Sequence, residues 1–160
     1  MDKPVRILFV CLGNICRSPM AEGLFAHHVN QRNLSHLFEI DSAGTAGYHV
    51  GELPDRRMRR TAKRHHIDLT SRARKFTASD LNSFDFILAM DRSNLSDILA
   101  LSDGEHSATV QLMRDFEPMA NADVPDPYYG GDDGFEAVYQ LLDVCCTNLL
   151  NHLLNQQNAQ

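Results

Sequence analysis

Residues 5–19, VRILFVCLGNICRSP, decide the fold of this chain. The first seven are largely apolar and rich in β-branched side chains, so they predict a short buried strand from Val5 to Cys11. Gly13 and Asn14 end this strand, because both residues tolerate the positive φ that a tight loop requires. The stretch therefore predicts a strand that runs into a compact loop.

A helix is expected directly after this loop, from about residue 19 to residue 31. Ser18 is a favourable N-cap, Pro19 suits the first helical position, and Glu22 lies near the positive end of the helix. Further strands are predicted at residues 38–42, 84–90 and 109–113, and further helices at residues 55–66, near 77–80, 92–101 and 134–154. One apolar stripe of the last helix is expected to face the core: Phe135, Val138, Leu142, Cys145, Leu149 and Leu153.

This alternation of strands and helices favours an α/β fold of three layers, a parallel sheet with helices on both faces. No linker, repeat or low-complexity segment interrupts it, so residues 1–160 are expected to form a single domain. In such folds the ligand binds beyond the carboxyl ends of the strands. Cys11 ends the first strand and is therefore expected at the ligand site.

The composition argues against several other classes of protein. The apolar run at residues 7–12 is too short to span a bilayer and no cleavage site follows it, so we expect a cytoplasmic protein that binds no membrane. Four cysteines without CxxC spacing imply neither a disulfide framework nor a zinc site, and we expect no metal or other cofactor. A net charge of -6 argues against nucleic-acid binding. The basic residues near 56–64 are expected to form a solvated helix face, with a docking patch for acidic phosphoproteins as the alternative.

The loop between Cys11 and Arg17 has the composition of a phosphate-binding site. Gly13 and Asn14 allow successive backbone N–H groups to turn inward, and the following helix adds its free N–H groups and positive dipole. Arg17 can hold two phosphate oxygens through its planar guanidinium. The same positive field favours the thiolate of Cys11, which makes it a nucleophile without a neighbouring base. An isolated buried cysteine is more often structural, but this spacing between a strand and a helix favours catalysis.

Transfer of a phosphoryl group to sulfur also needs an acid, because a departing phenolate or alkoxide must be protonated. The best candidate is Asp126, in the segment DPYYGG at residues 126–131. This segment lies in a long loop that can reach the site, and Pro127 restricts Asp126 to extended conformations. The same carboxylate can take a proton from water when the phosphocysteine is hydrolysed. An Asp-Pro pair alone usually only forms a turn, and its interpretation as a general acid depends on the presence of the Cys11 loop.

These two motifs resemble the low-molecular-weight protein tyrosine phosphatase family, over nearly the whole chain from Val5 to about Leu150. The segments that carry the resemblance are VCLGNICRSP at 10–19, DSAGT at 41–45, MDRSN at 90–94 and DPYY at 126–129. The resemblance implies a four-stranded parallel sheet with the phosphate-binding loop after its first strand. It also implies hydrolysis of phosphotyrosine and small aryl phosphates through a phosphocysteine intermediate.

The resemblance implies a role for each residue of the site. Cys11 is expected to be the nucleophile, Arg17 the phosphate clamp and Asp126 the general acid and base, while Ser18 donates a hydrogen bond to the Cys11 sulfur. The residues that form or support the loop are Leu12, Gly13, Asn14, Ile15, Cys16, Ser18 and Ser42. The rim that flanks the substrate ring is Tyr48, His49, Tyr128 and Tyr129. The implied partners are phosphotyrosine-containing proteins and phosphate or other oxyanions, bound by a monomer or a weakly self-associating chain.

Cys16 lies on the same loop as Cys11, and the family implies a redox role for it. A Cys11–Cys16 disulfide can capture oxidised Cys11 before irreversible over-oxidation. The alternative is that Cys16 only packs behind the loop. Cys145 and Cys146 point about 100° apart on a helix, so we expect a core and an edge position and no mutual disulfide.

The chain departs from the family pattern at one place. Many relatives carry a His in the segment that matches residues 70–74, where this chain has Ser71. In those relatives we expect the His to pair with the acid that corresponds to Asp91. Asp91 is therefore expected to have another partner here, without an effect on the chemical step.

Three alternatives to a tyrosine phosphatase are open. An arsenate reductase on the same fold needs further cysteines in a mid-chain segment, and none lies between Cys16 and Cys145. Protein arginine phosphatases tend to carry Thr where this chain has Ile15, and to lack the paired tyrosines at 128–129. A non-catalytic phosphate-binding protein has no need of the nucleophile, the clamp and the acid together. The larger tyrosine phosphatases are excluded, because they carry a His before the cysteine, where this chain has Val10.

Overall fold

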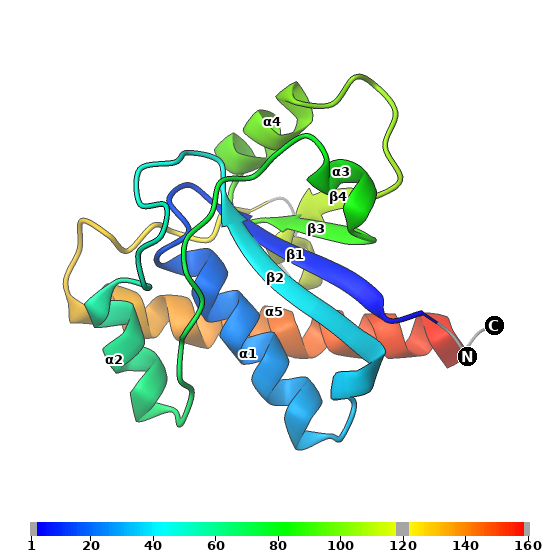
Figure 1. The fold of residues 1–160 in the computed structure, drawn as a ribbon. Helices are drawn as coiled ribbons and strands as arrows, with labels where there is room; N and C mark the ends of the chain where they lie inside the picture. The colour runs from blue at the N-terminus through cyan, green and yellow to red at the C-terminus, as the bar shows by residue number, and fades with distance from the viewer. Residues whose placement is uncertain (1–2, 118–121, 159–160) are drawn as a thin grey trace.

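The computed structural model describes residues 3–117 and 122–158, and Figure 1 shows their arrangement. The strands are β1 (Val5–Cys11), β2 (Phe38–Gly44), β3 (Phe86–Ala89) and β4 (Thr109–Leu112). The α-helices are α1 (Arg17–Gln31), α2 (Arg56–Arg64), α3 (Asp80–Ser83), α4 (Arg92–Ala100) and α5 (Asp132–Asn158), and the short 3₁₀ turns are η1 (Ser35–Leu37) and η2 (Met113–Phe116). The predicted alternation of strands and helices is confirmed.

The four strands form one parallel sheet in the order β2-β1-β3-β4. Central β1 pairs on both sides, with Val10 opposite Ala43 of β2 and Ala89 of β3. Residues from Ile7 to Val10 have no exposed surface, which explains why this strand is an unbroken apolar run. The predicted four-stranded α/β fold is confirmed, and Cys11 lies at the carboxyl end of the central strand.

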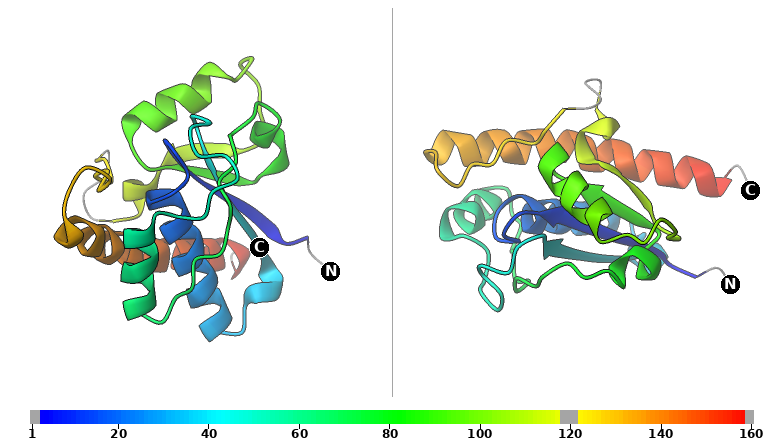
Figure 2. Two further views of the ribbon diagram at one scale, coloured as in Figure 1. Left: turned by 60° about the vertical axis from the view of Figure 1, so that its left-hand side comes forward. Right: turned by 90° about the horizontal axis from the view of Figure 1, so that it is seen from above.

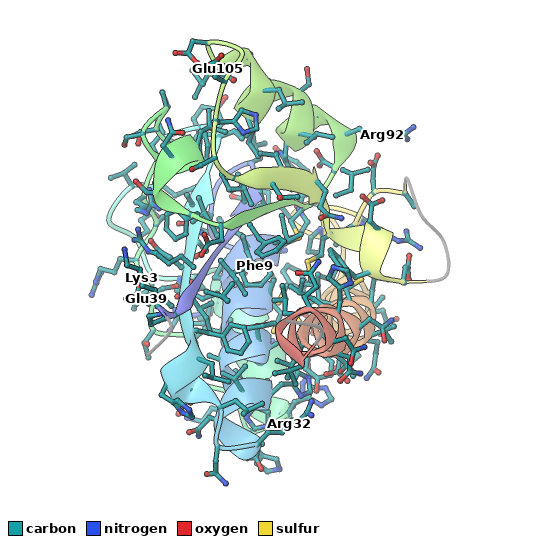
Figure 3. All side chains as sticks on the ribbon, turned by 90° about the vertical axis from the view of Figure 1, so that its right-hand side faces the viewer. Lys3, Phe9, Arg32, Glu39, Arg92 and Glu105 are labelled. Atoms are coloured by element: carbon teal, nitrogen blue, oxygen red, sulfur yellow. The ribbon has the colours of Figure 1, made fainter. Side chains whose placement is uncertain are left out.

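Helices cover both faces of the sheet. Ile7 and Phe9 belong to a core that includes side chains of α1, α2 and α5, whereas Leu8 and Val10 belong to a second core with α3 and α4. Figure 2 shows the helices on the two faces of the sheet from two further sides, and Figure 3 shows Phe9 in the interior. Successive residues of a strand point to opposite faces, so one apolar run serves both cores.

Helix α1 begins two residues earlier than predicted, and the expected N-cap role of Ser18 is wrong. Cys16 occupies the N-cap position and makes no side-chain cap hydrogen bond. The Ser18 hydroxyl is fully buried and lies 3.0 Å from Cys11 Sγ, where it also accepts a hydrogen bond from Asn14 Nδ2. The hydroxyl is therefore engaged by the loop and cannot serve the helix N–H groups.

The last helix also differs from its prediction. It extends over Asp132–Asn158, and the predicted stripe from Phe135 to Leu153 is buried as expected. Cys146 is not at an edge: its thiol contacts the Ala21 carbonyl of α1 and is as buried as Cys145, because α5 packs against both α1 and η2. Burial raises the pKa of Cys145 to about 12 and that of Cys146 well above its usual range. Both thiols are free and protonated at neutral pH.

None of the helices in the described part of the chain is both long and apolar enough to cross a membrane. This holds even for α5, the longest of them, whose exposed face carries polar residues.

Candidate active site

The loop after β1 connects Cys11 to the start of α1 (Figure 1). Asn14 has φ 57°, and this left-handed conformation turns its backbone N–H toward Cys11 Sγ at 3.3 Å. Ser18 Oγ lies 3.0 Å from the same sulfur. Both polar contacts come from one short loop and the first turn of α1.

A chain of hydrogen bonds fixes the orientation of this loop. Asn14 Nδ2 donates to Ser18 Oγ at 2.8 Å and to Ser42 Oγ at 2.9 Å, and Ser42 in turn donates to Glu22. Ser18 accepts from Asn14 and can donate its own proton to Cys11 Sγ at 3.0 Å or to the Ala43 carbonyl at 3.4 Å. Burial raises the pKa of Glu22 above its usual range, although hydrogen bonds from Ser42 and Ser71 oppose this effect.

The outer side of the loop is held by backbone hydrogen bonds from other segments. The carbonyls of Cys11 and Leu12 each accept at 2.9 Å, from Thr45 and Ala46, and the Ile15 carbonyl accepts from Asp55 at 2.7 Å. These bonds engage the carbonyl groups on the outer side of the loop, while the Asn14 N–H faces the sulfur. Gly44 is needed here, because a Cβ at that position would lie 2.7 Å from the Leu12 carbonyl oxygen.

Arg17 is almost fully buried beside the loop and is held by two acidic residues. Its guanidinium donates to Asp91 Oδ2 at 2.6 Å and to the Val124 carbonyl at 3.0 Å, and it lies 3.6 Å from Asp126 Oδ2. Burial alone would lower the pKa of Arg17, but the charges of Cys11, Asp91 and Asp126 raise it. Arg17 is therefore a permanent cation that faces the same space as the thiol.

Asp91 has Arg17 as its partner and also caps α4, where it accepts from Asn94 N–H at 2.7 Å. Ser71 hydrogen-bonds Glu22. Asp91 therefore has a partner other than residue 71, as expected, and Ser71 belongs instead to the Glu22–Ser42 network.

One pocket brings most of the predicted site residues together. It is lined by Cys11, Leu12, Gly13, Ile15, Cys16, Arg17, Tyr48, His49, Asp126, Tyr128 and Tyr129. Asn14, Ser18 and Ser42 lie behind the loop and are buried. Segments from three regions of the chain thus meet at the carboxyl end of β1, as expected for a doubly covered parallel sheet.

The mouth of this pocket is aromatic. Tyr48 and Tyr129 are 75% and 92% exposed, whereas Tyr128 packs more deeply, with its ring 5.0 Å from that of Tyr129 and 6.3 Å from that of His49. Asp126 is about one third exposed and accepts a hydrogen bond from the Tyr128 N–H at 3.1 Å. The pocket that holds the thiol and the carboxyl group therefore has a mouth lined by three tyrosines and a histidine.

Arg57 links the two loops of the site, a role that the basic run at 56–64 did not predict. Its guanidinium binds Asp55 at 3.0 Å and donates to the Tyr128 carbonyl at 3.0 Å, and it stacks 4.6 Å over the Phe135 ring. Asp55 itself donates its N–H to Ile15 of the phosphate loop. Burial alone would raise the pKa of Asp55, but the hydrogen bonds and charge of Arg57 lower it. The pair connects the Cys11 loop to the Asp126 loop.

Cys16 is a buried, free thiol that lines the same pocket as Cys11. Burial raises its pKa far above the usual range, and the charges of Asp55 and Cys11 add to this effect. Over the described ranges 3–117 and 122–158, the His, Cys, Asp and Glu side chains form no cluster of three suited to a metal ion.

A covered parallel sheet with a cysteine-and-arginine phosphate loop at the end of its central strand, and an aspartate beside it, is the architecture of a cysteine-dependent phosphatase. Comparison with known proteins specifies the class further. The family model of low molecular weight phosphotyrosine protein phosphatases matches residues 6–159. The human low molecular weight phosphotyrosine protein phosphatase is 44% identical over 146 residues, which cover 90% of this chain and 92% of the human protein. The chain belongs to the low-molecular-weight phosphotyrosine protein phosphatase family.

Solved structures agree with this assignment. A protein tyrosine phosphatase from Entamoeba histolytica superposes with a TM-score of 0.90 and 38% identity, covering 96% of this chain and 99% of that one. A Drosophila arginine phosphatase gives a TM-score of 0.85 and 35% identity, covering 92% and 96%. Because both share the fold, the fold alone does not choose the substrate. The family match and the curated relatives favour the tyrosine phosphatase, and the chain is a protein-tyrosine phosphatase, a hydrolase of phosphoproteins.

Proposed function

We propose that Cys11, Arg17 and Asp126 carry out the hydrolysis of phosphotyrosine within one catalytic domain. The Cys11 thiolate attacks phosphorus, so that an S–P bond forms as the bond between phosphorus and the phenolic oxygen breaks. Asp126 donates its proton to the departing phenolate. Water then attacks phosphorus, Asp126 takes a proton from that water, and the S–P bond breaks to release inorganic phosphate and the thiolate.

The observation that carries this proposal is the convergence of three groups on one pocket. The sulfur of Cys11 receives the Asn14 N–H at 3.3 Å, and Arg17 lies 3.6 Å from Asp126. Arg17 lines the same pocket as the nucleophile and lies beside the acid, where it can hold the phosphate oxygens during the transfer.

The aromatic mouth supports phosphotyrosine as the preferred group. Tyr48 and Tyr128 both line the pocket, where they would flank a phenyl ring, and His49 lies next to Tyr128. Phosphate and other small oxyanions are expected to bind the loop and compete with the substrate, since the donors recognise the anion itself. We further propose that the protein acts as a monomer or associates weakly.

Cys16 is proposed to protect the nucleophile from over-oxidation. Peroxide converts Cys11 to a sulfenic acid; the Cys16 sulfur then loses its proton and displaces the hydroxyl group as water, which forms the Cys11–Cys16 disulfide. An added thiol reduces this disulfide. Because the raised pKa of Cys16 keeps it protonated, disulfide formation should accelerate as the pH rises. After peroxide treatment, wild type should recover with thiol and Cys16→Ser should not; equal recovery would contradict this role.

Turnover of aryl phosphates by wild type, Cys11→Ser and Asp126→Ala tests the mechanism. Cys11→Ser should be inactive. Asp126→Ala should lose most activity on phenyl phosphate and least on p-nitrophenyl phosphate, whose leaving group needs little protonation. Activity in Cys11→Ser, or an equal loss on both substrates in Asp126→Ala, would contradict the assigned roles.

A further inference from the structure

A hollow rich in arginine adjoins the active-site pocket. The two share Ile15, His49 and Tyr128 as lining residues. The second hollow is also lined by three arginines that the mechanism above does not use: Arg56, Arg59 and Arg72.

These arginines come from two separate parts of the chain. Arg56 and Arg59 lie on α2, whereas Arg72 comes from the extended segment that follows it. Backbone hydrogen bonds of 2.8 Å, from Gly51 to Ala73 and from Ala73 to Glu52, hold that segment against the loop before α2. The hollow is therefore created by the fold, at the end of the molecule where α2 and the start of α5 lie side by side (Figure 1).

The guanidinium groups present free donors to this hollow. Arg59 Nε donates to the Pro54 carbonyl at 2.9 Å and Arg72 Nη1 to the Gly51 carbonyl at 3.0 Å. Each of these bonds uses one N–H and leaves the others available, because a guanidinium has five. Arg56 is exposed, and no side chain within the described ranges forms a hydrogen bond or ion pair with it. Two of the cations are thus held in place in advance, which reduces the entropy lost on binding.

The hollow has an excess of positive charge. Its two carboxylates are already paired, Glu52 with His49 Nδ1 at 2.9 Å and Asp55 with Arg57 at 3.0 Å. An anion that enters therefore meets three arginines against two carboxylates, one of which Arg57 already neutralises. Planar guanidiniums bind carboxylates through paired N–H donors, which makes a carboxylate a fitting ligand.

We propose that this hollow binds the acidic side chain of a residue that flanks the phosphotyrosine in the protein substrate. The inference rests on the proposed function, because the phosphotyrosine in the first pocket is what places the neighbouring residues over the second. The protein therefore selects phosphotyrosine sites that have Asp or Glu nearby, and the preference depends on ionic strength.

The test compares kcat/KM for three phosphotyrosine peptides that differ only in the flanking residues, which are Glu, Gln or Lys. At low salt wild type should prefer the Glu peptide to the Gln peptide by about twofold to fivefold, since one exposed ion pair contributes up to about fivefold. Arg59→Gln and Arg72→Gln should each reduce this ratio, and Arg72→Glu should shift the preference toward the Lys peptide. Lys63→Gln removes a positive charge from the exposed side of α2 outside the hollow, and should keep the wild-type ratio.

Each outcome bears on one claim. Equal kcat/KM for the Glu and Gln peptides in wild type would overturn the acidic subsite while leaving the phosphatase intact. If the preference for the Glu peptide survives in both arginine variants, or if Lys63→Gln reduces it equally, the preference arises from the overall electrostatic field of the protein and not from this hollow. Failure of wild type to hydrolyse any of the peptides would instead contradict the proposed function.

Discussion

Replacement of Gly44 by Ala should disturb the phosphate loop without touching any group that reacts. The added Cβ would lie 2.7 Å from the Leu12 carbonyl oxygen and 3.1 Å from the Asn14 nitrogen, and both are backbone atoms. An ordinary carbon–oxygen contact is about 3.3 Å or more, so the loop must retreat by at least about 0.6 Å. Misplacement by about 1 Å can cost about a hundredfold in rate, and we expect a loss of about tenfold in kcat/KM.

The assay measures kcat/KM on p-nitrophenyl phosphate and the inhibition constant of phosphate, well below the melting temperature. Overpacking of this kind costs about 1–3 kcal/mol, which corresponds to a fall in Tm of about 3–10 °C for a chain of this size. Gly47→Ala is the matched control, because its Cβ would meet only side-chain atoms at 3.7 Å. Catalysis and phosphate binding in Gly44→Ala within twofold of wild type would refute the claim that the close approach at Gly44 shapes the loop.

Three other predictions concern parts of the molecule outside the loop. Arg57→Met should reduce kcat/KM by about tenfold on phenyl phosphate and by about twofold or less on p-nitrophenyl phosphate, because the Tyr128 carbonyl loses its hydrogen-bond donor and Asp126 is displaced. Lys63→Met is the control for the loss of charge. An equal loss of kcat/KM on both substrates would indicate a general structural effect. Burial raises the pKa of Glu22, so its ionisation destabilises the fold as pH rises from about 4.3 through the raised value. The Tm of Glu22→Gln relative to wild type should therefore increase over that range, and a constant difference would contradict the assignment. Iodoacetamide should modify the native protein at Cys11. It should reach Cys145 and Cys146 only after unfolding, because these two thiols are fully buried and have raised pKa values. Mass spectrometry of the modified protein checks this.

Local sequence was sufficient for the elements that local physics controls. The run from Val5 to Cys11 predicted a strand buried on both faces, and β1 has those bounds. The apolar stripe of α5 was also predictable from helical spacing. Boundaries were less accurate where a side chain had two possible partners. Ser18 has the chemistry of an N-cap, but its hydroxyl is taken by Cys11 and Asn14, so α1 starts earlier.

By itself the sequence determined the alternation of strands and helices and placed a cysteine, a glycine and an arginine in one loop before a helix. These features depend on neighbours along the chain, through φ preferences, capping and the period of the apolar residues. Only the tertiary structure decided that Arg17 pairs with Asp91, 74 residues away, that Arg57 holds the Tyr128 carbonyl, and that Gly44 touches the loop. Such contacts depend on how the carboxyl ends of the strands and the following loops converge, and no local preference of the chain encodes that geometry.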